Sequence, residues 1–528
     1  MSWPATLALV ACALFAATAA ANSQPGVTRD SANARGAGRV ITYPAPKGEP
    51  ASADYEVKVN GKPVFCYTSF RCDTDSKQTI SGRPVSPLSF CCFDQDGPVK
   101  VEIRFLDGLK KSGIDTSKVI VRPLARGIKP AVKDGRITFT LDKPGQLSVE
   151  PGGGLHHSLH VFSNPPEKDV PDRNDPNVLY FGPGYHELGD TQLKSGQTVY
   201  VAGGAIVSLK PQPKDKLTKE IEHDAYGVKV YWVPGMIGAT WQKNITLRGR
   251  GILCGRKAIE QGQRGYLAKF EQVENLKVEG IIIRDCSVWS LHACNCNNVK
   301  VSNVKVVGYY VNNDGICMGG TSDALVEDCF SHNADDSLEI KVWRPQKNVT
   351  FRNCIVWNDI GGSFGLMHEC GATLENVLYK DCTVIHSTDD SSICPVVGIK
   401  LSGPGSVKNI RFEDIVIEDV SGPRRPALKC INNWDDWHMD LPTKPDSPHE
   451  LLNPPKREQP SGSISNVTFK NIRILNCRNQ DVVLIAENAS SPVSNITFEN
   501  VVIMGKRLVP DDPRIKKNAW VTDVKVRE

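Results

Sequence analysis

The sequence predicts an all-β fold: a right-handed parallel β-helix preceded by a small N-terminal β-sandwich. One observation is a motif of alternating apolar and polar residues that recurs every 23 to 33 residues, with one step of 57. Another is a series of short alternating segments with Gly and Pro turns between residues 51 and 165. The third is the composition, 40% hydrophobic and 23% charged over 528 residues, which excludes a disordered chain.

The N-terminal stretch is apolar and built of small residues, and Ala19-Ala20-Ala21 offers a cleavage site. We therefore expect residues 1–21 to be a signal peptide and the protein to be secreted or periplasmic. Leu9-Val10-Ala11-Cys12 resembles a lipid-attachment signal, but the apolar stretch continues past Cys12, which disfavours lipoprotein anchoring. No later run reaches the roughly 18 apolar residues that cross a bilayer, so no membrane span is expected.

Residues 22–50 are rich in Gly, Ala, Pro and Ser and are predicted to be a linker. Residues 51–165 are predicted to be the β-sandwich, with strands at 55–59, 99–103 and 136–141. Cys66, Cys72, Cys91 and Cys92 lie close together in this stretch. Export permits disulfides, so one or two bridges are expected among these four residues.

Residues 175–506 are predicted to be the β-helix and residues 507–528 a C-terminal tail. The motif begins with a polar residue, usually Asn, followed by apolar, polar and apolar residues. Its copies start at Asn244, Asn275, Asn298, Asp323, Asn348, Asn376, Asn409, Asn466 and Asn495. Such a period, rich in β-branched residues and without helical periodicity, is typical of β-helix coils with a stacked apolar interior, and the leucine-rich-repeat consensus is missing.

Cysteines occur at one fixed position of three successive repeats. Cys329, Cys354 and Cys382 each fall six residues after their repeat start. We therefore expect them to stack as a ladder of small buried side chains.

Three aspartates fall at similar positions of neighbouring repeats. Asp314 lies 16 residues after Asn298, and Asp335 and Asp336 lie 12 and 13 residues after Asp323. Adjacent coils stack about 4.8 Å apart, so these carboxyl groups are expected to meet on one face. Their repulsion raises at least one pKa, which provides an acid beside ionised carboxylates, as inverting glycoside hydrolysis requires. This chemistry needs no metal and no other cofactor.

The motifs around these aspartates resemble those of a known clan. Asn312-Asn313-Asp314-Gly315 resembles the Asn-Thr-Asp motif of polygalacturonases, and Asp335-Asp336 resembles their Asp-Asp pair. Trp289, His292 and the segment 296–299 resemble the family's Trp-x-x-His and Cys-x-Asn-Val segment one coil earlier. Residues 175–505 are thus similar to the pectinase/dextranase clan of parallel β-helix glycoside hydrolases, families 28 and 49.

The preceding sandwich and the spacing from Asp336 to Lys341 resemble the dextranase family more closely. The resemblance implies a secreted hydrolase of a polysaccharide or oligosaccharide. It also implies that Asp335 is the general acid and that Asp314 and Asp336 position the attacking water.

Two family motifs differ in this chain. The stretch matching the polygalacturonase Gly-His-Gly motif is Gly361-Gly362-Ser363-Phe364, and Arg-Ile-Lys appears as Gly398-Ile399-Lys400. Without that Arg the bidentate clamp for a uronate carboxylate is missing, so neutral glucan-like and pectic polymers both remain open. The candidate substrate-binding residues are Asn312, Lys341, His368, Lys400, Trp434 and Trp437.

Other classes of function also remain open. A β-helical polysaccharide lyase or uronate epimerase needs a Lys or Arg base, for which Lys341 and Lys400 are candidates. A non-catalytic carbohydrate-binding β-helix would need none of these groups. A nucleic-acid partner is not expected, because the net charge of +4 is spread evenly.

Overall fold

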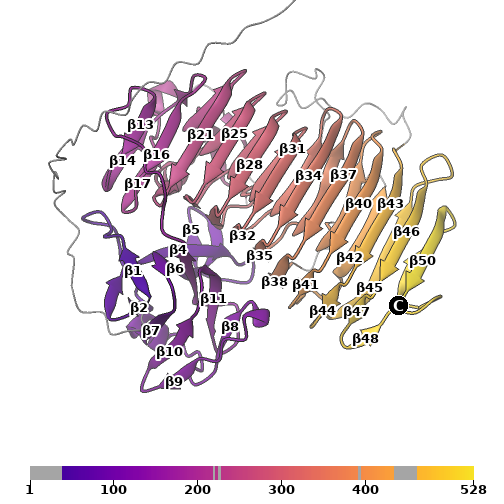
Figure 1. The fold of residues 1–528 in the computed structure, drawn as a ribbon, viewed down its shortest axis with the longest axis horizontal. Helices are drawn as coiled ribbons and strands as arrows, with labels where there is room; N and C mark the ends of the chain where they lie inside the picture. Colours follow the sequence, from indigo (N-terminus) through magenta and orange to yellow (C-terminus); the bar gives the residue numbers. More distant parts are fainter. Residues whose placement is uncertain (1–37, 218–219, 224–226, 390–393, 433–460) are drawn as a thin grey trace, which may run out of the picture. The chain divides into compact units, whose positions relative to one another are not determined.

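The computed structural model describes residues 38–217, 220–223, 227–389, 394–432 and 461–528, which form a β-sandwich and a parallel β-helix (Figure 1). The predicted fold class is confirmed. The expected signal peptide, Trp434 and Trp437 lie outside the described residues. Within the described ranges, no helix has the length and apolar character needed to cross a bilayer.

The sandwich consists of two sheets whose apolar side chains alternate toward a common core. One sheet contains β1 (Arg39–Thr42), β4 (Cys66–Cys72), β5 (Thr79–Ile80), β6 (Arg83–Asp96), β8 (Val119–Arg122), β11 (Gly145–Pro151) and β12 (Ser158–Asn164). The other contains β2 (Tyr55–Val59), β3 (Lys62–Val64), β7 (Val99–Phe105), β9 (Ala131–Lys133) and β10 (Arg136–Leu141). The predicted strands at 55–59, 99–103 and 136–141 are confirmed as β2, β7 and β10. Two short helices, α1 (Asp107–Lys111) and η1 (Leu124–Arg126), lie between strands.

Two predictions about this region differ from the structure. Residues 39–42, predicted to belong to the linker, form β1 antiparallel to β6 and bury Val40. Cys66 and Cys91 are opposite each other in the β4–β6 pair, yet Cys66, Cys91 and Cys92 are unbridged thiols. They are buried as small apolar groups, and burial raises the pKa of each thiol.

The β-helix has three long parallel sheets, to which each complete coil contributes one strand apiece. The first comprises β13 (Val178–Phe181), β16 (Thr198–Val201), β21 (Lys243–Gly249), β25 (Glu274–Glu279), β28 (Asn297–Ser302), β31 (Ser322–Glu327), β34 (Gln346–Arg352), β37 (Leu374–Lys380), β40 (Val407–Glu413), β43 (Ile464–Lys470), β46 (Val493–Glu499) and β50 (Val521–Arg527). The second comprises β14 (Gly184–Leu188), β17 (Ala205–Leu209), β22 (Ile252–Cys254), β26 (Ile282–Arg284), β29 (Lys305–Val307), β32 (Phe330–Asn333), β35 (Ile355–Asn358), β38 (Thr383–Ser387), β41 (Val416–Ile417), β44 (Arg473–Ile474) and β47 (Val502–Ile503), with the antiparallel β48 (Lys506–Arg507) at its end.

The predicted acids lie just before the first residues of two strands of the third sheet. It comprises β15 (Thr191–Gln192), β20 (Ile237–Thr240), β24 (Ala268–Glu271), β27 (Leu291–Cys294), β30 (Ile316–Gly319), β33 (Leu338–Val342), β36 (Phe364–Cys370), β39 (Val397–Ser402), β42 (Pro426–Asn432), β45 (Asn479–Ala486) and β49 (Ile515–Lys517). A small separate sheet is formed by β18 (Glu220–His223), β19 (Lys229–Trp232) and β23 (Gln263–Arg264), and η2 (Lys214–Lys216) and α2 (Arg256–Glu260) are short helices.

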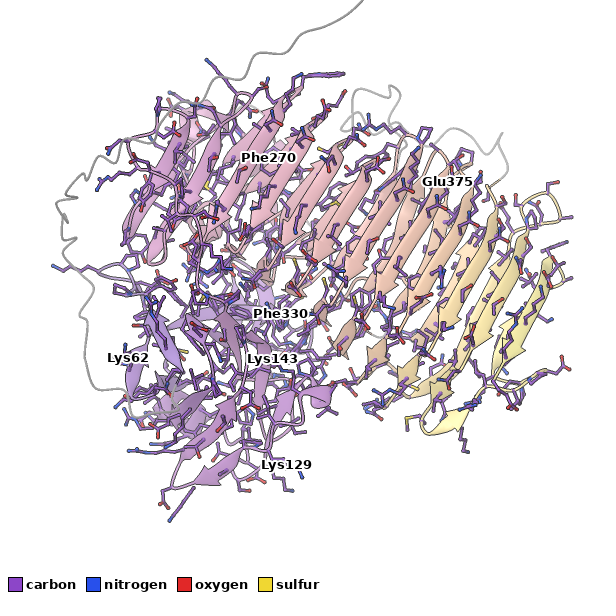
Figure 2. All side chains as sticks on the ribbon, viewed as in Figure 1. Lys62, Lys129, Lys143, Phe270, Phe330 and Glu375 are labelled. Carbon is purple, nitrogen blue, oxygen red and sulfur yellow. The ribbon has the colours of Figure 1, made fainter. Side chains whose placement is uncertain are left out.

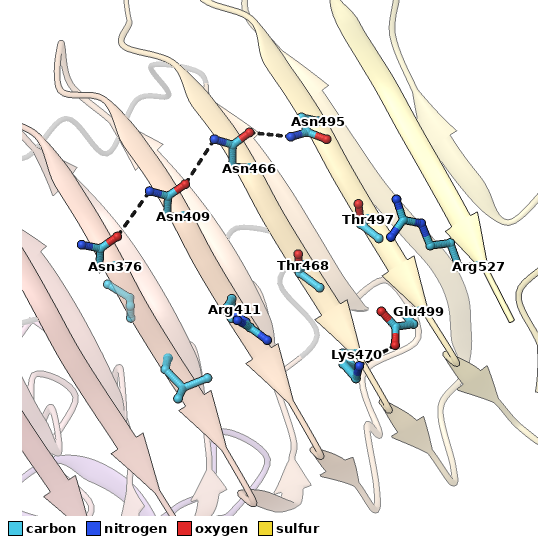
Figure 3. Close-up of a pocket in the computed structure, with 12 residues that line it drawn as sticks. Asn376, Asn409, Arg411, Asn466, Thr468, Lys470, Asn495, Thr497, Glu499 and Arg527 are labelled. Atoms are coloured by element: carbon cyan, nitrogen blue, oxygen red, sulfur yellow. Dashed lines mark hydrogen bonds and ion pairs between the residues drawn. The ribbon is translucent and has the colours of Figure 1, made fainter.

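The repeated polar residue has a conformational reason. At every repeat start, from Asn244 (φ 59°) to Asn495 (φ 51°), the backbone is left-handed, a region that Asn and Asp tolerate better than other non-glycine residues. The side chains also bond from coil to coil. Asn409 Nδ2 donates to Asn376 Oδ1 at 3.3 Å, and Asn466 Nδ2 donates to Asn409 Oδ1 at 3.2 Å (Figure 3). Asn is thus selected by both its backbone and its side chain.

The interior of the β-helix is apolar and stacked in columns. Cys329, Cys354 and Cys382 occupy equivalent positions of successive coils, which confirms their predicted ladder. A column of stacked aromatic rings runs beside them, from Phe351 to Phe498. Apolar side chains also fill the contact between the sandwich and the second sheet. There Phe330, labelled in Figure 2, packs against Phe162 with their ring centroids 5.1 Å apart.

The predicted C-terminal tail, residues 507–528, instead contains the last coil. β50 pairs with β46 and β49 pairs with β45, both in parallel. Asp523 stands 28 residues after Asn495 with φ 53°, and Asp523-Val524-Lys525-Val526 repeats the motif. This copy extends the repeat beyond the predicted end of the β-helix at residue 506.

Candidate active site

The predicted acids lie at the entrances to two adjacent strands of the third sheet. Ile316 of β30 is opposite Leu338 of β33, so Asp314 and Asp336 hold equivalent positions on neighbouring coils. The Gly315 N–H donates to the Asp336 carbonyl at 2.8 Å, which joins the two coils at this point. The structure therefore brings Asp314, Asp335 and Asp336 together.

The turn that carries Asp335 and Asp336 is held by hydrogen bonds. Asn333 Nδ2 donates to the carbonyls of Asp335 at 2.7 Å and Asp336 at 3.0 Å. The Gly362 N–H, one coil further, donates to Asp336 Oδ1 at 2.6 Å. The Asp336 N–H in turn donates to Asp335 Oδ1 at 2.9 Å. Both carboxyl groups are thus fixed in direction.

A fourth carboxyl group completes the cluster. Oxygens of Asp314, Asp336 and Glu339 lie within 4.8 Å of one another, and all three residues are buried. Asp335 is the partly exposed member of the group. Carboxylates this close would suit a cation, but Lys341 Nζ already lies 3.0 Å from Glu339, 3.7 Å from Asp336 and 4.0 Å from Asp314. The ammonium supplies the positive charge that the carboxylates require.

Burial and mutual repulsion hold protons on these acids. Burial and, to a smaller extent, the negative charge of Asp336 raise the pKa of Asp335 well above its ordinary value. Burial is also the main cause that raises the pKa of Asp314, and the charges of Glu339 and Asp335 raise it further. Burial also raises the pKa of Glu339 to about 7, against the opposing effect of Lys341. Because these groups titrate together, the retained proton belongs to the cluster.

Lys341 itself remains charged. Its burial would lower its pKa, but the facing carboxylates of Glu339 and Glu369, each 3.0 Å from Nζ, raise that pKa well above its usual value. Lys341 is therefore an electrostatic support of the cluster and not a base.

An irregularity in β36 brings in the second glutamate. Ile340 pairs with Leu366 but Val342 pairs with Cys370, so three residues of β36 stand opposite Lys341 alone. Within this bulge His368 has φ 64°, and Glu369 turns toward Lys341. His368 Nε2 lies 3.2 Å from Cys394 Sγ, and burial lowers the pKa of the imidazole, partly offset by Asp336.

The remaining predicted residues lie around this centre. Asn312 is partly exposed in the turn before Asp314, and Lys400 is buried opposite Met367 in the β36–β39 pair. Gly398 has φ 149°, and a Cβ there would collide with the backbone of Lys429. The arginine of the polygalacturonase motif therefore does not fit this backbone.

Aromatic side chains lie beside Lys341 of the cluster. Trp289 and Trp343 stack with centroids 6.0 Å apart and planes 9° apart, and His292 lies edge-on to both. Lys341 Nζ is 5.0 Å from the Trp289 ring centroid. A flat, partly exposed Trp289 beside a carboxyl cluster suits the apolar face of a sugar ring.

The sequence prediction omitted Glu339, Glu369 and Trp343. The alternation Leu338-Glu339-Ile340-Lys341-Val342 gives a signal for Glu339, because it places Glu339 on the same face as Lys341. Glu369 gave no such signal, since the bulge in β36 breaks the alternation. Trp343 follows β33 directly and belongs to none of the motifs on which the prediction rests.

A separate shallow pocket of about 600 Å³ lies on the outer face of the first sheet (Figure 3). It is lined by the Asn column and by residues such as Arg411, Thr468 and Lys470. Its lining contains none of the clustered acids, and it is formed by the regular exterior of stacked coils.

Comparison with known proteins agrees with the resemblance found in the sequence. Residues 185–424 match the model of glycosyl hydrolases family 28. The chain is 26% identical over 187 residues to a probable polygalacturonase of Arabidopsis thaliana, covering 34% of this chain and 40% of that protein. It is 30% identical over 157 residues to polygalacturonase QRT2 of the same plant, covering 29% and 35%. The matched region thus spans less than half the length of these relatives.

Among solved structures, Dex49A from Penicillium minioluteum is similar to nearly the whole chain. The TM-score is 0.55 and the sequence identity 14%, over 92% of this chain and 96% of that one. At this identity the likeness shows the fold, a β-helix with a preceding β-sandwich. The resemblance to the pectinase/dextranase clan is confirmed: residues 185–424 match the family 28 model, and the fold is similar to that of Dex49A.

Proposed function

We propose that this chain hydrolyses O-glycosidic bonds of a polysaccharide with inversion at the anomeric carbon. The observation that carries the proposal is the meeting of Asp314 and Asp336 on adjacent coils beside the partly exposed Asp335. The family whose model matches acts on carbohydrate, and the relatives are polygalacturonases, so a polysaccharide is the substrate class favoured. Export, expected from the apolar N-terminal stretch, is part of the same proposal.

Asp335 is proposed as the general acid. It is accessible to a substrate, and burial together with Asp336 raises its pKa, so the carboxyl group keeps its proton. It donates this proton to the glycosidic oxygen as the bond to the anomeric carbon breaks.

Asp336 is proposed as the base. It accepts the Gly362 N–H and lies 3.7 Å from Lys341, and both contacts stabilise its negative charge. It takes a proton from a water molecule that Asp314 helps to hold, and the water oxygen bonds to the opposite face of the anomeric carbon. Burial also raises the pKa of Asp314 and of Glu339, so these two carboxyl groups retain a proton between them in addition to the proton of Asp335.

The elimination chemistry of a lyase or epimerase is less well supported. It would require Lys341 or Lys400 to remove a proton from the sugar. Lys341 is bound to Glu339 and Glu369, which raise its pKa and keep it protonated. Lys400 is buried two strands away from Lys341, in β39.

The test is release of new reducing ends from a panel containing polygalacturonate, dextran and other α- and β-glucans. Asp335→Asn should lower kcat by about 10²–10⁴-fold, which is the usual contribution of a general acid. Asp323→Asn is the matched control, because Asp323 is exposed and Asn occupies its position in neighbouring coils. NMR of the first product should show the inverted anomer.

Three outcomes would contradict the proposal. Products that absorb in the ultraviolet would indicate a lyase. An Asp335→Asn variant as active as wild type would place the chemistry elsewhere. Binding of a polymer without new reducing ends would indicate a non-catalytic β-helix.

A further inference from the structure

The sandwich contacts both turns that carry or face the catalytic acids. The first turn, residues 309–313, leads directly into Asp314. The second, residues 359–362, faces Asp335 and Asp336 from the next coil. We call these segments the catalytic turns; strand β4 of the sandwich contacts both, and β6 contacts the first.

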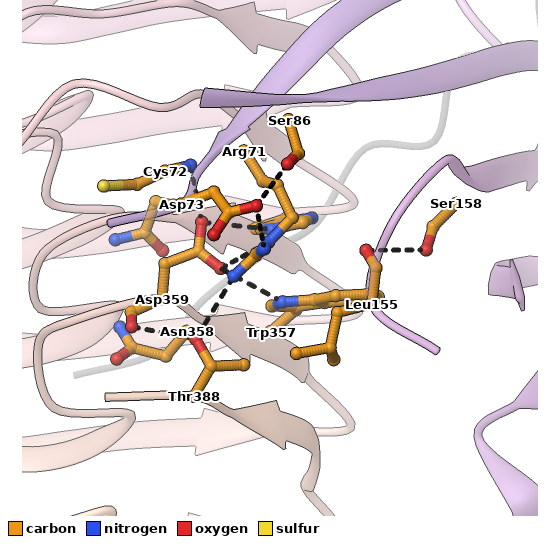
Figure 4. Close-up of polar contacts among 12 residues, drawn as sticks. Arg71, Cys72, Asp73, Ser86, Leu155, Ser158, Trp357, Asn358, Asp359 and Thr388 are labelled. Carbon is orange, nitrogen blue, oxygen red and sulfur yellow. Dashed lines mark hydrogen bonds and ion pairs between the residues drawn. The ribbon is translucent and has the colours of Figure 1, made fainter. Parts of the chain in front are cut away.

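The second catalytic turn is bound by Arg71 at the end of β4 (Figure 4). Arg71 Nε lies 3.2 Å from Asp359 Oδ1, and the Cys72 N–H donates to Asp359 Oδ2 at 2.9 Å. The Arg71 and Asp359 side chains are only 5% and 1% exposed. Burial would raise the pKa of Asp359, but Arg71 and His332 outweigh this effect and lower it, so the Asp359 carboxylate is ionised.

This turn contacts the acids directly, so its position determines theirs. Three residues after Asp359, the Gly362 N–H donates to Asp336 Oδ1. Gly361 packs so closely that a Cβ there would collide with the backbone of Asp335 and Asp336. A displacement of Asp359 would therefore move the donor that orients Asp336.

The first catalytic turn is bound by the β5–β6 hairpin. Arg83 is fully buried; its Nη2 donates to the Tyr310 hydroxyl at 3.0 Å, and its Cζ lies 4.2 Å from the ring centroid. Val85 joins an apolar cluster with residues of the turn, and Phe70 and Ile80 pack against that cluster. The Asn313 N–H closes the turn onto the Tyr310 carbonyl at 2.8 Å, one residue before Asp314.

We propose that the sandwich is a positioning element of the active site, with Arg71 and Arg83 as its positioning residues. The inference rests on the proposed function for its kinetic part. Two buried guanidinium groups, from the paired strands β4 and β6, fix the two turns from which Asp314 and the donor to Asp336 project. Catalytic groups displaced by about 1 Å lose roughly 10²-fold in rate, so this contact should control kcat.

The chain offers a matched control in the same contact. Arg122 of β8 also reaches from the sandwich to a buried carboxylate of the β-helix, with Nη1 2.7 Å from Glu418 Oε2. Its side chain is 10% exposed, and Glu418 follows β41, two coils beyond β35. Arg122 thus tests the stability of the contact without touching a catalytic turn.

The experiment compares Arg71→Met with Arg122→Met, and Arg71→Lys with Arg122→Lys as milder pairs. Arg71→Met should lower kcat by about 10- to 100-fold with KM changed less than about threefold, and Arg71→Lys should recover part of that loss. Both Arg122 variants should keep the kcat of wild type at temperatures where they are folded. Thermal unfolding measures the destabilisation of each variant.

Hydrogen–deuterium exchange of peptides covering the catalytic turns provides a readout that needs no substrate. Arg71→Met should accelerate exchange at residues 359–362, whereas Arg122→Met should not. Equal kcat losses in the two pairs, or unchanged exchange in Arg71→Met, would overturn the inference. If wild type releases no reducing ends, the proposed function fails, while the exchange comparison still decides whether Arg71 positions the turn.

Discussion

At the scale of single residues, Lys341 determines how many negative charges the site can hold. Its ammonium lies within 4.0 Å of Asp314, Asp336, Glu339 and Glu369. One cation cannot neutralise four buried carboxylates and the neighbouring Asp335. The cluster therefore takes up protons, and this proton supply is what an acid catalyst at near-neutral pH requires.

Glu339→Gln should change stability in a pH-dependent way. Burial raises the pKa of Glu339 to about 7 from 4.5, so unfolding releases a proton, and wild type loses stability as pH rises from about 4.5 to 7. The substitution removes at most about 3 kcal/mol of this loss. Tm measured at pH 5 and pH 8 should therefore shift in favour of the variant at pH 8. A difference independent of pH would contradict the assignment.

The site residues that could be predicted from the sequence are those whose spacing follows the repeat of the coils. Asp314, Asp335 and Asp336 stand at strand entrances, where a repeat start fixes the register. Glu369 was inaccessible to such reasoning because three residues of β36 oppose one of β33. Trp434 and Trp437, outside the described residues, remain predictions.

At the scale of elements, the coil is specified by a few recurring positions. A left-handed Asn or Asp lies near the start of each first-sheet strand from β21 to β50, and buried aliphatic or aromatic residues alternate after it. Phe351, Tyr379, Phe412, Phe469 and Phe498 form one continuous stack with centroids 4.5–5.3 Å apart. This periodicity explains why the strands of the β-helix were predictable. The last coil, whose motif begins at Asp523, follows the same periodicity but was not predicted.

Phe412→Ala should reduce the free energy of unfolding by about 3–5 kcal/mol. Phe412 is fully buried between Tyr379 and Phe469, so truncation leaves a cavity that the stacked coils cannot close. The adjacent Arg411→Ala is the control, since its side chain is 59% exposed and its loss should change stability by less than about 0.5 kcal/mol. Urea denaturation measures both. Equal urea midpoints for the two variants would contradict the stabilising role of the aromatic stack.

At the scale of the whole molecule, the contact between sandwich and β-helix buries three histidines. His160 Nε2 lies 2.7 Å from His332 Nδ1, His332 faces Asp359, and His386 lies between Glu150 and Asp419. Contacts such as that between Arg71 and Asp359, 288 residues apart, leave no local pattern in the sequence. This is why the two domains could be predicted, but not their contact.

Lowering the pH should reduce the free energy of unfolding because of the histidines buried in this contact, and His160→Gln should make that reduction smaller. Burial and, to a smaller extent, the facing His332 and His386 lower the pKa of His160 well below 6.5. The unfolded chain therefore binds a proton at this imidazole that the folded protein does not bind. Stability is therefore lost as pH falls below about 6.5. His386 acts in the opposite direction, because Glu150 and Asp419 outweigh its burial and raise its pKa. Between pH 7 and pH 5 the variant should lose up to about 2 kcal/mol less than wild type. Parallel pH dependences in urea denaturation would contradict this expectation.

The Asn column also bears on how such a chain can change in length. Asn409 and Asn466 are 57 residues apart in the sequence, yet they are hydrogen-bonded neighbours in the column, like pairs separated by only 25 to 33 residues. The rise from one coil to the next is therefore independent of the number of residues that connect them. Doubling the length of a connection costs only about 0.6 kcal/mol in loop entropy. Insertions at this point could thus accumulate or be exchanged during evolution while the rest of the column keeps its spacing.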